Sequence, residues 1–263
     1  MSKRFFLRVR SRHPSHNGLR RNRNLLFPEK VVFRLGSTTQ TLIEKEINSV
    51  ESIRNSSDKL KMKALFLENN VPTAKHYTLN EIKNEEVKFP ILAKKRFGSR
   101  GNGMVKLDNT EQLDEFLEGD TRGYYFEEYF NGAREYRLHV SNLGCFYACR
   151  KMRKSEATDR WYFNSKNCIW VTENKKETDE NGEFLRFSDK PNELFNKPEN
   201  WNDMVEASKN ALLAVGLDIG AIDLRCKKDG TFIILETNSA PSFSEITHIK
   251  YVQHLKQLVN SKY

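Results

Sequence analysis

A loop rich in glycine between two short apolar segments constrains the fold of this 263-residue chain more than any other feature. Pro90–Lys94 is apolar and ends in lysine, three glycines fall within Gly98–Gly103, and Met104–Leu107 is apolar again. The pattern predicts two strands joined by a loop whose backbone N–H groups can approach an anion, with the Lys94 ammonium beside it. A strand follows the glycines, so the loop is neither a Walker A motif nor a dinucleotide fingerprint, both of which open a helix. Taken alone, the pattern is also typical of an ordinary hairpin turn.

Two acidic residues lie on segments that are predicted to pair as a hairpin, Ala221–Cys226 and Thr231–Glu236. Antiparallel pairing can place Asp223 beside Glu236, and Asn238 points to the same side as Glu236 because side chains alternate along a strand. Two carboxylates and an amide oxygen form a hard, all-oxygen site that suits Mg²⁺. The alternative is a strand end that emerges into solvent.

A third polar segment, residues 126–137, contains a strand, a turn and a second strand. Its turn can offer backbone groups to the edge of a base such as adenine, and Glu135 can accept from ribose hydroxyls. Arg137 faces the same side as Glu135 and suits a bidentate contact with a phosphate or a carboxylate. Taken alone, the segment favours an exposed ladder of salt bridges.

Apolar periodicity and capping residues predict the surrounding elements. Asp58 is a typical N-cap residue for a helix that runs to about Asn69. The other predicted helices are Glu111–Leu117, residues 202–215 and a C-terminal helix, and the other predicted strands are Phe5–Arg10, Val31–Leu35, Tyr124–Phe130, Glu135–Val140 and Cys145–Lys151. The expected inward faces are Leu60, Ala64 and Leu67 in the first helix, Met204, Ala207, Ala211 and Ala214 in the helix at 202–215, and Ile246, Ile249, Val252 and Leu255 in the last. Residues 40–57 are predicted to be a connector with some helix, and the polar residues 152–200 to be loop-like and mobile.

The whole net charge of +9 lies in residues 1–34, which hold ten Lys or Arg and one acid, whereas the remainder is neutral. Such clustering favours a polyanion: nucleic acid, an acidic peptide or phosphates. A solvated face, a disordered tail and an organellar presequence are alternatives. The four cysteines form no CxxC pair, which indicates reduced thiols in a cytoplasmic protein. No segment approaches the roughly 18 apolar residues of a membrane span.

In this order, the motifs resemble the ATP-grasp superfamily, with closest similarity to the RimK-like and YheC/D-like group and related phage-encoded ligases. The resemblance covers about residues 55–250 and rests on Asp58-Lys59-Leu60 with Val71-Pro72-Thr73, Lys94 with Gly98–Gly103, Glu127–Arg137, Asp218–Asp223 and Leu235–Pro241. It implies an α+β, ATP-grasp fold in which two α+β lobes sandwich ATP after a short basic N-terminal pre-ATP-grasp segment. The implied limits are 1–55 for the reduced N-terminal lobe, 56–130 for the small lobe with its glycine-rich lid, and 131–263 for the large lobe with the metal site. Leu35-Gly36-Ser37-Thr38 resembles the turn that ends the N-terminal stretch in some of these ligases.

The resemblance also implies residue roles. Lys59 and Lys94 would hold the phosphates, with Gly98, Ser99, Gly101 and Gly103 as a mobile lid. Glu127, Glu128 and the Phe130 backbone would frame adenine, and Glu135 would hold ribose. Asp223, Glu236 and Asn238 would carry one or two Mg²⁺ ions, with Mn²⁺ as an alternative metal. Arg137, with Arg150 or Arg153, would stabilise an acyl phosphate, and Asn164 would match a phosphate-facing asparagine of RimK-like enzymes.

The implied activity is that of an ADP-forming carboxylate–amine ligase that works through an acyl phosphate, with a peptide or protein as a candidate substrate. One alternative is an ATP-grasp phosphotransferase, which would share the nucleotide residues but need no amine. Another is a nucleic-acid-binding protein that uses residues 1–34 and retains a vestigial ATP site.

Overall fold

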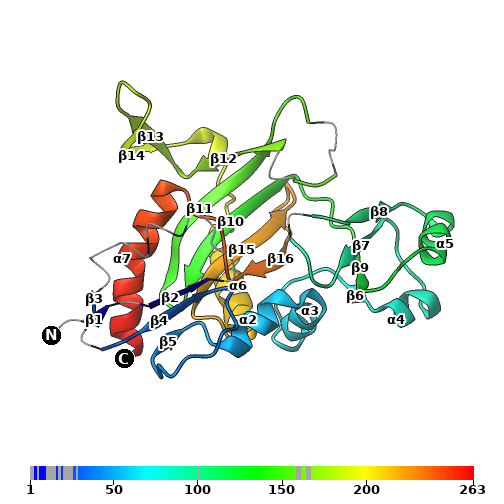
Figure 1. Cartoon of the computed structure of the whole chain (residues 1–263). Coiled ribbons are helices and arrows are strands. Elements are labelled where there is room, and N and C mark those ends of the chain that lie inside the picture. The colour runs from blue at the N-terminus through cyan, green and yellow to red at the C-terminus, as the bar shows by residue number, and fades with distance from the viewer. Residues whose placement is uncertain are drawn as a thin grey trace.

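Two antiparallel sheets build most of the structure and lie beside each other (Figure 1). The computed structural model describes residues 3, 4, 6–9, 16, 19, 26, 27, 29–99, 101–157, 161–163 and 167–263. The predicted strands and helices outside residues 152–200 are confirmed, with small differences at their ends. Arg10, Arg12, Arg20, Arg21 and Arg23 of the predicted basic segment lie outside the described residues.

The larger sheet has five strands in the order β12-β11-β10-β15-β16. They are β10 (Arg134–Ser141), β11 (Gly144–Arg153), β12 (Cys168–Thr172), β15 (Ile219–Cys226) and β16 (Phe232–Asn238). Tyr136, Leu138 and Ile222 point to one face and share a core with α6 (Trp201–Ala214). The other face carries polar side chains, because successive side chains of a strand alternate between faces. The predicted stripe of α6 is confirmed, since Met204 and Ala211 are fully buried.

Helices α2 (Val50–Ser57) and α3 (Lys59–Glu68) complete this core. Asp58 caps α3 as predicted, because its Oδ1 accepts from the Lys61 N–H at 3.2 Å. The predicted inward face of α3 is wrong: Met62, Lys63 and Phe66 are fully buried, whereas Leu67 is 55% exposed. A search for apolar spacing misses this face because one of its members is a lysine.

The smaller sheet has four strands in the order β6-β9-β7-β8. They are β6 (His76–Tyr77), β7 (Ile91–Lys95), β8 (Val105–Leu107) and β9 (Tyr124–Glu128), and α4 (Leu79–Asn84) and α5 (Thr110–Glu118) pack on them. Tyr77, Ile91 and Phe126 lie at the centre of a separate core. Each sheet therefore has its own apolar centre, and polar residues gather between the two.

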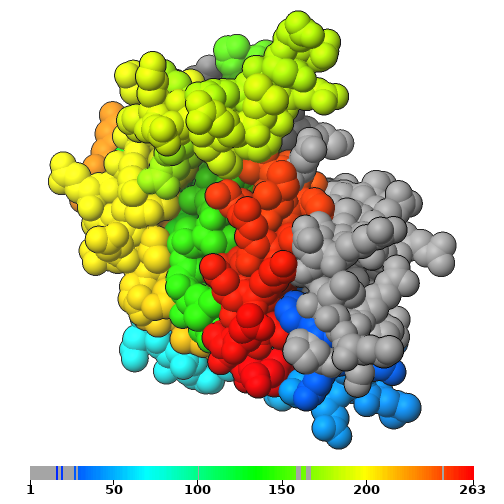
Figure 2. Space-filling model, turned by 90° about the vertical axis from the view of Figure 1, so that its left-hand side faces the viewer, coloured from blue at the N-terminus to red at the C-terminus, as the bar shows by residue number. Residues whose placement is uncertain are grey.

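The N-terminal strands pack against the C-terminal helix. Strands β2 (Phe6–Val9), β4 (Val32–Leu35) and β5 (Glu46–Ile47) form a parallel sheet, and β1 (Lys3–Arg4) pairs with β3 (Leu26–Phe27). Phe33 shares a core with Tyr251 and Leu255 of α7 (Glu245–Lys262). Figure 2 shows α7 along this side, with the N-terminal segments beside it. Ile249, predicted to face inward, is 41% exposed, because Tyr251 and Leu258 occupy the buried side.

The prediction of a loop-like segment at residues 152–200 is wrong. Besides β12, it contains β13 (Asn174–Thr178), β14 (Phe184–Pro191) and the short helix η3 (Glu193–Phe195). Strands β13 and β14 pair with each other, and most of their side chains are exposed. The two strands of this ribbon form backbone hydrogen bonds with each other and need few buried apolar residues, so their polar sequence resembles that of a loop. Within the described residues, no helix is long and apolar enough to cross a membrane.

A buried asparagine fastens the N-terminal sheet to the larger sheet. The Asn48 side chain donates to the carbonyls of Arg34 (3.2 Å) and Ile219 (2.9 Å). Its Oδ1 accepts from the backbone N–H groups of Asp218 (2.9 Å) and Ile219 (3.1 Å). Asn48 is fully buried and has φ of 63°, a left-handed conformation that asparagine tolerates better than most residues.

Asn48→Ala should lower the free energy of unfolding by roughly 3–5 kcal/mol. The substitution leaves several buried backbone groups without a hydrogen-bond partner and adds backbone strain. Denaturant unfolding would measure this loss. Asn70→Ala is the matched control, since Asn70 also has positive φ (54°) but is exposed. It should cost only about 1 kcal/mol. Equal losses in the two variants would contradict the role given to the Asn48 hydrogen bonds.

Candidate functional site

A cleft of about 1760 Å³ lies between the two sheets. Its walls combine the polar face of the larger sheet, the end of the smaller sheet, the start of α3 and the glycine loop. The sequence-predicted residues that line it are Lys59, Lys94, Gly98, Ser99, Gly101, Glu127, Glu128, Phe130, Glu135, Arg137, Asp223, Glu236 and Asn238. The turn Gly36–Thr39 also borders the cleft. Residues that are far apart in the sequence thus meet in one place.

Charged side chains on the larger sheet form two rows across neighbouring strands. One row places Arg137 of β10 opposite Asp223 of β15, which lies opposite Glu236 of β16. The pairing of Asp223 with Glu236 is the register that the sequence predicted. The neighbouring row consists of Lys151, Glu135 and Arg225. These rows form because β10 lies between β11 and β15, so its acid and its base each meet opposite charges.

Asp223 is almost completely buried and accepts from two cations. The Arg137 Nε and Nη2 atoms donate to its two oxygens at 2.7 and 2.8 Å, and Lys151 Nζ lies 3.2 Å from Oδ2. Burial alone would raise the pKa of Asp223, but Arg137 and Lys151 outweigh it and hold that pKa well below its usual range. The carboxylate is therefore ionised at neutral pH and fixes the orientation of Arg137.

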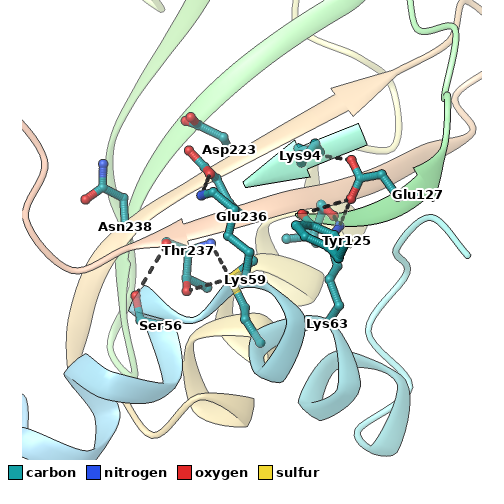
Figure 3. A network of polar contacts seen from close by, with 12 residues as sticks. Ser56, Lys59, Lys63, Lys94, Tyr125, Glu127, Asp223, Glu236, Thr237 and Asn238 are labelled. Atoms are coloured by element: carbon teal, nitrogen blue, oxygen red, sulfur yellow. Dashed lines mark hydrogen bonds and ion pairs between the residues drawn. The ribbon is translucent and has the colours of Figure 1, made fainter. Parts of the chain in front are cut away.

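Glu236 pairs with the first lysine of α3. Lys59 Nζ lies 2.5 Å from Glu236 Oε2. Burial disfavours the charged form of Glu236, yet Lys59 lowers its pKa below the usual value. Figure 3 shows Lys59 rising from α3 toward Glu236, with Asp223 on the adjacent strand. The pair therefore connects the N-terminus of α3 to strand β16 of the larger sheet.

The three candidate metal ligands lie along neighbouring strands (Figure 3). Asp223 and Glu236 hold basic partners, and Asn238 Oδ1 accepts from the Ala240 N–H at 2.9 Å. No cluster of three or more His, Cys, Asp or Glu residues in the described part of the chain could hold a metal by itself. This all-oxygen donor set fits Mg²⁺ that arrives with further oxygen ligands, such as phosphates. The metal assignment stays a prediction.

Glu127 lies in the wall formed by the smaller sheet and is held by two lysines. Lys94 Nζ lies 2.6 Å from Oε1, and Lys63 Nζ lies 3.4 Å from Oε2. Burial would raise the pKa of Glu127, but Lys63 and Lys94 together lower it to about 2. The side chains of Glu127 and Lys63 are almost inaccessible, whereas that of Lys94 is 15% exposed. Lys94 is thus the member of this trio that presents its charge to the cleft.

Arg225 donates hydrogen bonds to the segment that connects the two sheets. Its guanidinium donates to Glu135 Oε2 at 2.9 Å and to the carbonyls of Phe130 (3.3 Å) and Trp161 (3.4 Å). Lys151 Nζ donates to the other Glu135 oxygen at 2.6 Å. Both oxygens of Glu135 therefore have basic partners. A ribose hydroxyl bound to Glu135, as predicted, would have to share these oxygens with Lys151 and Arg225.

Gly132 makes room for Arg225. A Cβ at this position would lie 2.3 Å from Arg225 Cγ and 3.0 Å from the carbonyl oxygen of Cys226. Gly132→Ala should therefore displace the arginine and cost about 2 kcal/mol in thermal or denaturant unfolding. Gly119→Ala is the matched control, because the added Cβ would meet only an ordinary contact of 3.5 Å. A Gly132→Ala protein as stable as this control would show that the connection between β9 and β10 accommodates the methyl group freely.

The glycine loop joins the paired strands β7 and β8, as its sequence predicted. Gly101 and Gly103 have φ of 70° and 72°, which favours glycine over residues with a side chain. A Cβ on Gly101 would touch Tyr162, which lies between β11 and β12, at 3.4 Å. The loop therefore already lies near the opposite wall of the cleft. Arg100 lies outside the described residues, as does the predicted phosphate-facing Asn164.

Two of the predicted catalytic arginines do not line the cleft. Arg150 pairs in register with Tyr136, whose ring lies in the core on the opposite face, and Arg150 donates to the Leu194 carbonyl at 2.8 Å. Arg153 stacks on the Phe163 ring at 3.8 Å. Of the three candidates, the structure brings only Arg137 next to the acids.

Sequence reasoning missed Lys63, Lys151 and Arg225. Lys151 follows Arg150 directly and points to the opposite face. Strand periodicity alone does not say which of these two residues faces the cleft. Arg225 lies two residues after Asp223, and this spacing was a usable signal for a shared face. Lys63 gave no signal, because a lysine within a helix is usually solvated.

No protein-family model and no curated protein matches the sequence. Solved structures resemble it. The VanG D-Ala:D-Ser ligase from Enterococcus faecalis has a TM-score of 0.60 and 16% identity, and the match covers 88% of this chain and 72% of that chain. The ATP-grasp ligase PsnB, complexed with a minimal precursor, has a TM-score of 0.52 and 15% identity over 83% of this chain and 64% of that one. Biotin carboxylase from Campylobacter jejuni has a TM-score of 0.58 and 17% identity over 88% and 53%. The chain therefore spans between 53% and 72% of the lengths of these proteins.

Proposed function

We propose, from the ATP-grasp fold that this chain adopts, that it is an ATP-dependent ligase. The more specific proposal is ADP-forming synthesis of a C–N bond between a carboxylate and an amine. The observation that carries it is the convergence of two lysines and two acids in one cleft. Lys59 and Lys94 supply fixed positive charge, and Asp223 and Glu236 supply ionised oxygens.

The chemistry would rest on positioning and charge. Lys59 and Lys94 would bind phosphate oxygens, and Phe130 would border the base. Asp223, Glu236 and Asn238 would hold a divalent cation together with the nucleotide, and that ion would neutralise phosphate charge. Arg137 is held in one orientation by the two hydrogen bonds that it donates to Asp223, so its charge is preorganised for an acyl phosphate.

In this scheme, a substrate carboxylate oxygen attacks the γ-phosphorus of ATP, and the bond to the bridging oxygen of ADP breaks. A neutral amine then attacks the carbonyl carbon, phosphate leaves with the bonding electrons, and the amine loses a proton. The two steps form one amide for each ATP converted to ADP and phosphate.

A peptide or protein is the candidate substrate. The cleft of about 1760 Å³ is larger than the roughly 300–1,000 Å³ of pockets for a single small ligand, which leaves room for a second, extended substrate. The four free thiols suit a reducing compartment such as the cytoplasm. Residues 1–34 remain the candidate surface for an acidic peptide or a nucleic acid.

The test is phosphate release from Mg-ATP in the presence of pooled amino acids and an acidic peptide, with mass spectrometry of the products. ADP together with a product heavier by one amide-linked unit would support the ligase. A stable phosphorylated product would instead identify a phosphotransferase. Salt-dependent RNA or DNA binding that survives loss of the cleft residues would favour the nucleic-acid alternative.

A further inference from the structure

Lys63 is a buried lysine to which neither the motifs nor the proposed chemistry assigns a role. It lies on the inner face of α3 with 0% exposure. Its Nζ donates to Thr73 Oγ1 at 2.7 Å and to the Ile234 carbonyl at 3.4 Å, and it lies 3.4 Å from Glu127 Oε2. A buried ammonium is costly unless it is paired, so this placement requires the carboxylate.

The contacts of Lys63 join the two sheets. Helix α3 packs with the larger sheet, and Ile234 belongs to β16 of that sheet. Glu127 belongs to β9 of the smaller sheet. Figure 3 shows Lys63 approaching Glu127 from the helix, while Lys94 approaches from the neighbouring strand β7. Glu127 therefore lies between a cation at the back and a cation that faces the cleft.

The charge balance of this trio is the main observation. A pair of Glu127 and Lys94, 2.6 Å apart, would be neutral, and Lys94 would offer little net charge to an anion. With Lys63 the trio carries one net positive charge. Lys94 is its most exposed member, so the excess charge reaches the cleft there. The neighbouring pair of Lys59 and Glu236 is neutral and provides no such excess.

We propose that Lys63 is a positioning residue for nucleotide binding: it neutralises Glu127 from behind and so makes the charge of Lys94 available to phosphates. The proposal rests on the proposed ATP site. Lys63 does not touch the nucleotide itself, since it is sealed behind Glu127. Its effect should therefore appear in nucleotide affinity and in the dependence of that affinity on charge.

The pH dependence gives one measurable consequence. Burial, with help from Lys94, lowers the pKa of Lys63 to about 8, although Glu127 opposes the shift. The charged or titratable groups around it are Glu127 on β9, Lys94 on β7, Glu236 on β16 and His76 on β6. The pKa values of both acids and of His76 are lowered, so these groups keep their charge states between pH 7 and 9. As the pH rises through 8, Lys63 loses its proton and nucleotide affinity should fall. Nucleotide binding near pH 8 should in turn take up a proton.

The experiment measures binding of the ATP analogue AMP-PNP with Mg²⁺ by calorimetry, at a temperature where circular dichroism shows each protein folded. Lys63→Met should weaken binding at pH 7 by about 10- to 100-fold, the scale of one lost charge in a partly shielded site. It should also remove the fall in affinity between pH 7 and 9 and the proton uptake. Lys75→Met is the control, because Lys75 pairs with Glu85 on the surface.

A charge-conserving variant separates charge from packing. Lys63→Arg keeps a positive charge beside Glu127, so affinity at pH 7 should stay within about threefold of wild type and should no longer fall between pH 7 and 9, because arginine does not lose its proton in this range. If Lys63→Met binds as tightly as wild type, the proposal is wrong although the ATP site stands. If folded Lys63→Arg binds as weakly as Lys63→Met, packing rather than charge explains the effect, and the proposal is again overturned. If wild-type protein does not bind the analogue, the proposed function itself fails.

Discussion

Replacing Glu236 with glutamine should reduce ATP turnover by at least about a hundredfold while the fold remains intact. Glu236 is ionised, because Lys59 outweighs the effect of burial on its pKa. Glutamine keeps the shape but cannot supply negative charge to a divalent cation or to Lys59. Phosphate release from Mg-ATP, with circular dichroism of the same samples, measures both parts of this expectation.

The matched control is Glu177→Gln, which makes the same chemical change in an exposed ion pair with Arg186. Its turnover should equal that of wild type. Wild-type turnover in Glu236→Gln would remove this residue from the metal site and would leave Asp223 as the acid to examine.

Lys94→Met should lower turnover by about two to three orders of magnitude, the loss typical of a preorganised charge contact. The variant would also leave Glu127 with Lys63 as its remaining lysine partner, so the wall of the cleft would lose its net positive charge. Phosphate-release kinetics should show the loss in both kcat and kcat/KM, because the contact is expected to strengthen as the phosphoryl group transfers.

Lys95→Met provides an internal comparison one residue away. The Lys95 ammonium lies 3.8 Å from the centre of the Tyr124 ring and donates to the Arg122 carbonyl at 3.3 Å. Its removal should change turnover by no more than about threefold. If Lys95→Met is the more damaging of the two, the phosphate contact has been assigned to the wrong lysine.

Local patterns predicted much of the fold and part of the site. The glycine loop, the cap at Asp58 and the alternation around Asp223 and Glu236 depend on residues that are close in sequence or joined by one turn. These features can therefore be predicted from the sequence, because they depend on the backbone freedom of glycine, on helix capping and on strand periodicity. The resemblance then supplied the global arrangement that these fragments alone left open.

The remaining features depend on which strands become neighbours. Strand β10 pairs with β15, and this pairing brings Arg225 to Glu135 although the two residues are 90 positions apart in the sequence. Lys151 reaches Glu135 through the hairpin of β10 and β11. Lys63 of α3 likewise pairs with Glu127, which belongs to β9 of the smaller sheet. Burial of a lysine cannot be anticipated before its partner is located, so the face of α3 was predicted wrongly.

The hydrogen bonds of Asn48 also bear on how the chain folds during synthesis. Their partners at Asp218 and Ile219 lie 170 and 171 residues further on, and the core around Phe33 includes Tyr251 and Leu255. The core around these early strands is therefore completed only by residues that lie far later in the sequence. Contacts of such long sequence separation slow folding. A nascent chain that ends before β15 would expose these strands, which makes it a natural substrate for chaperones.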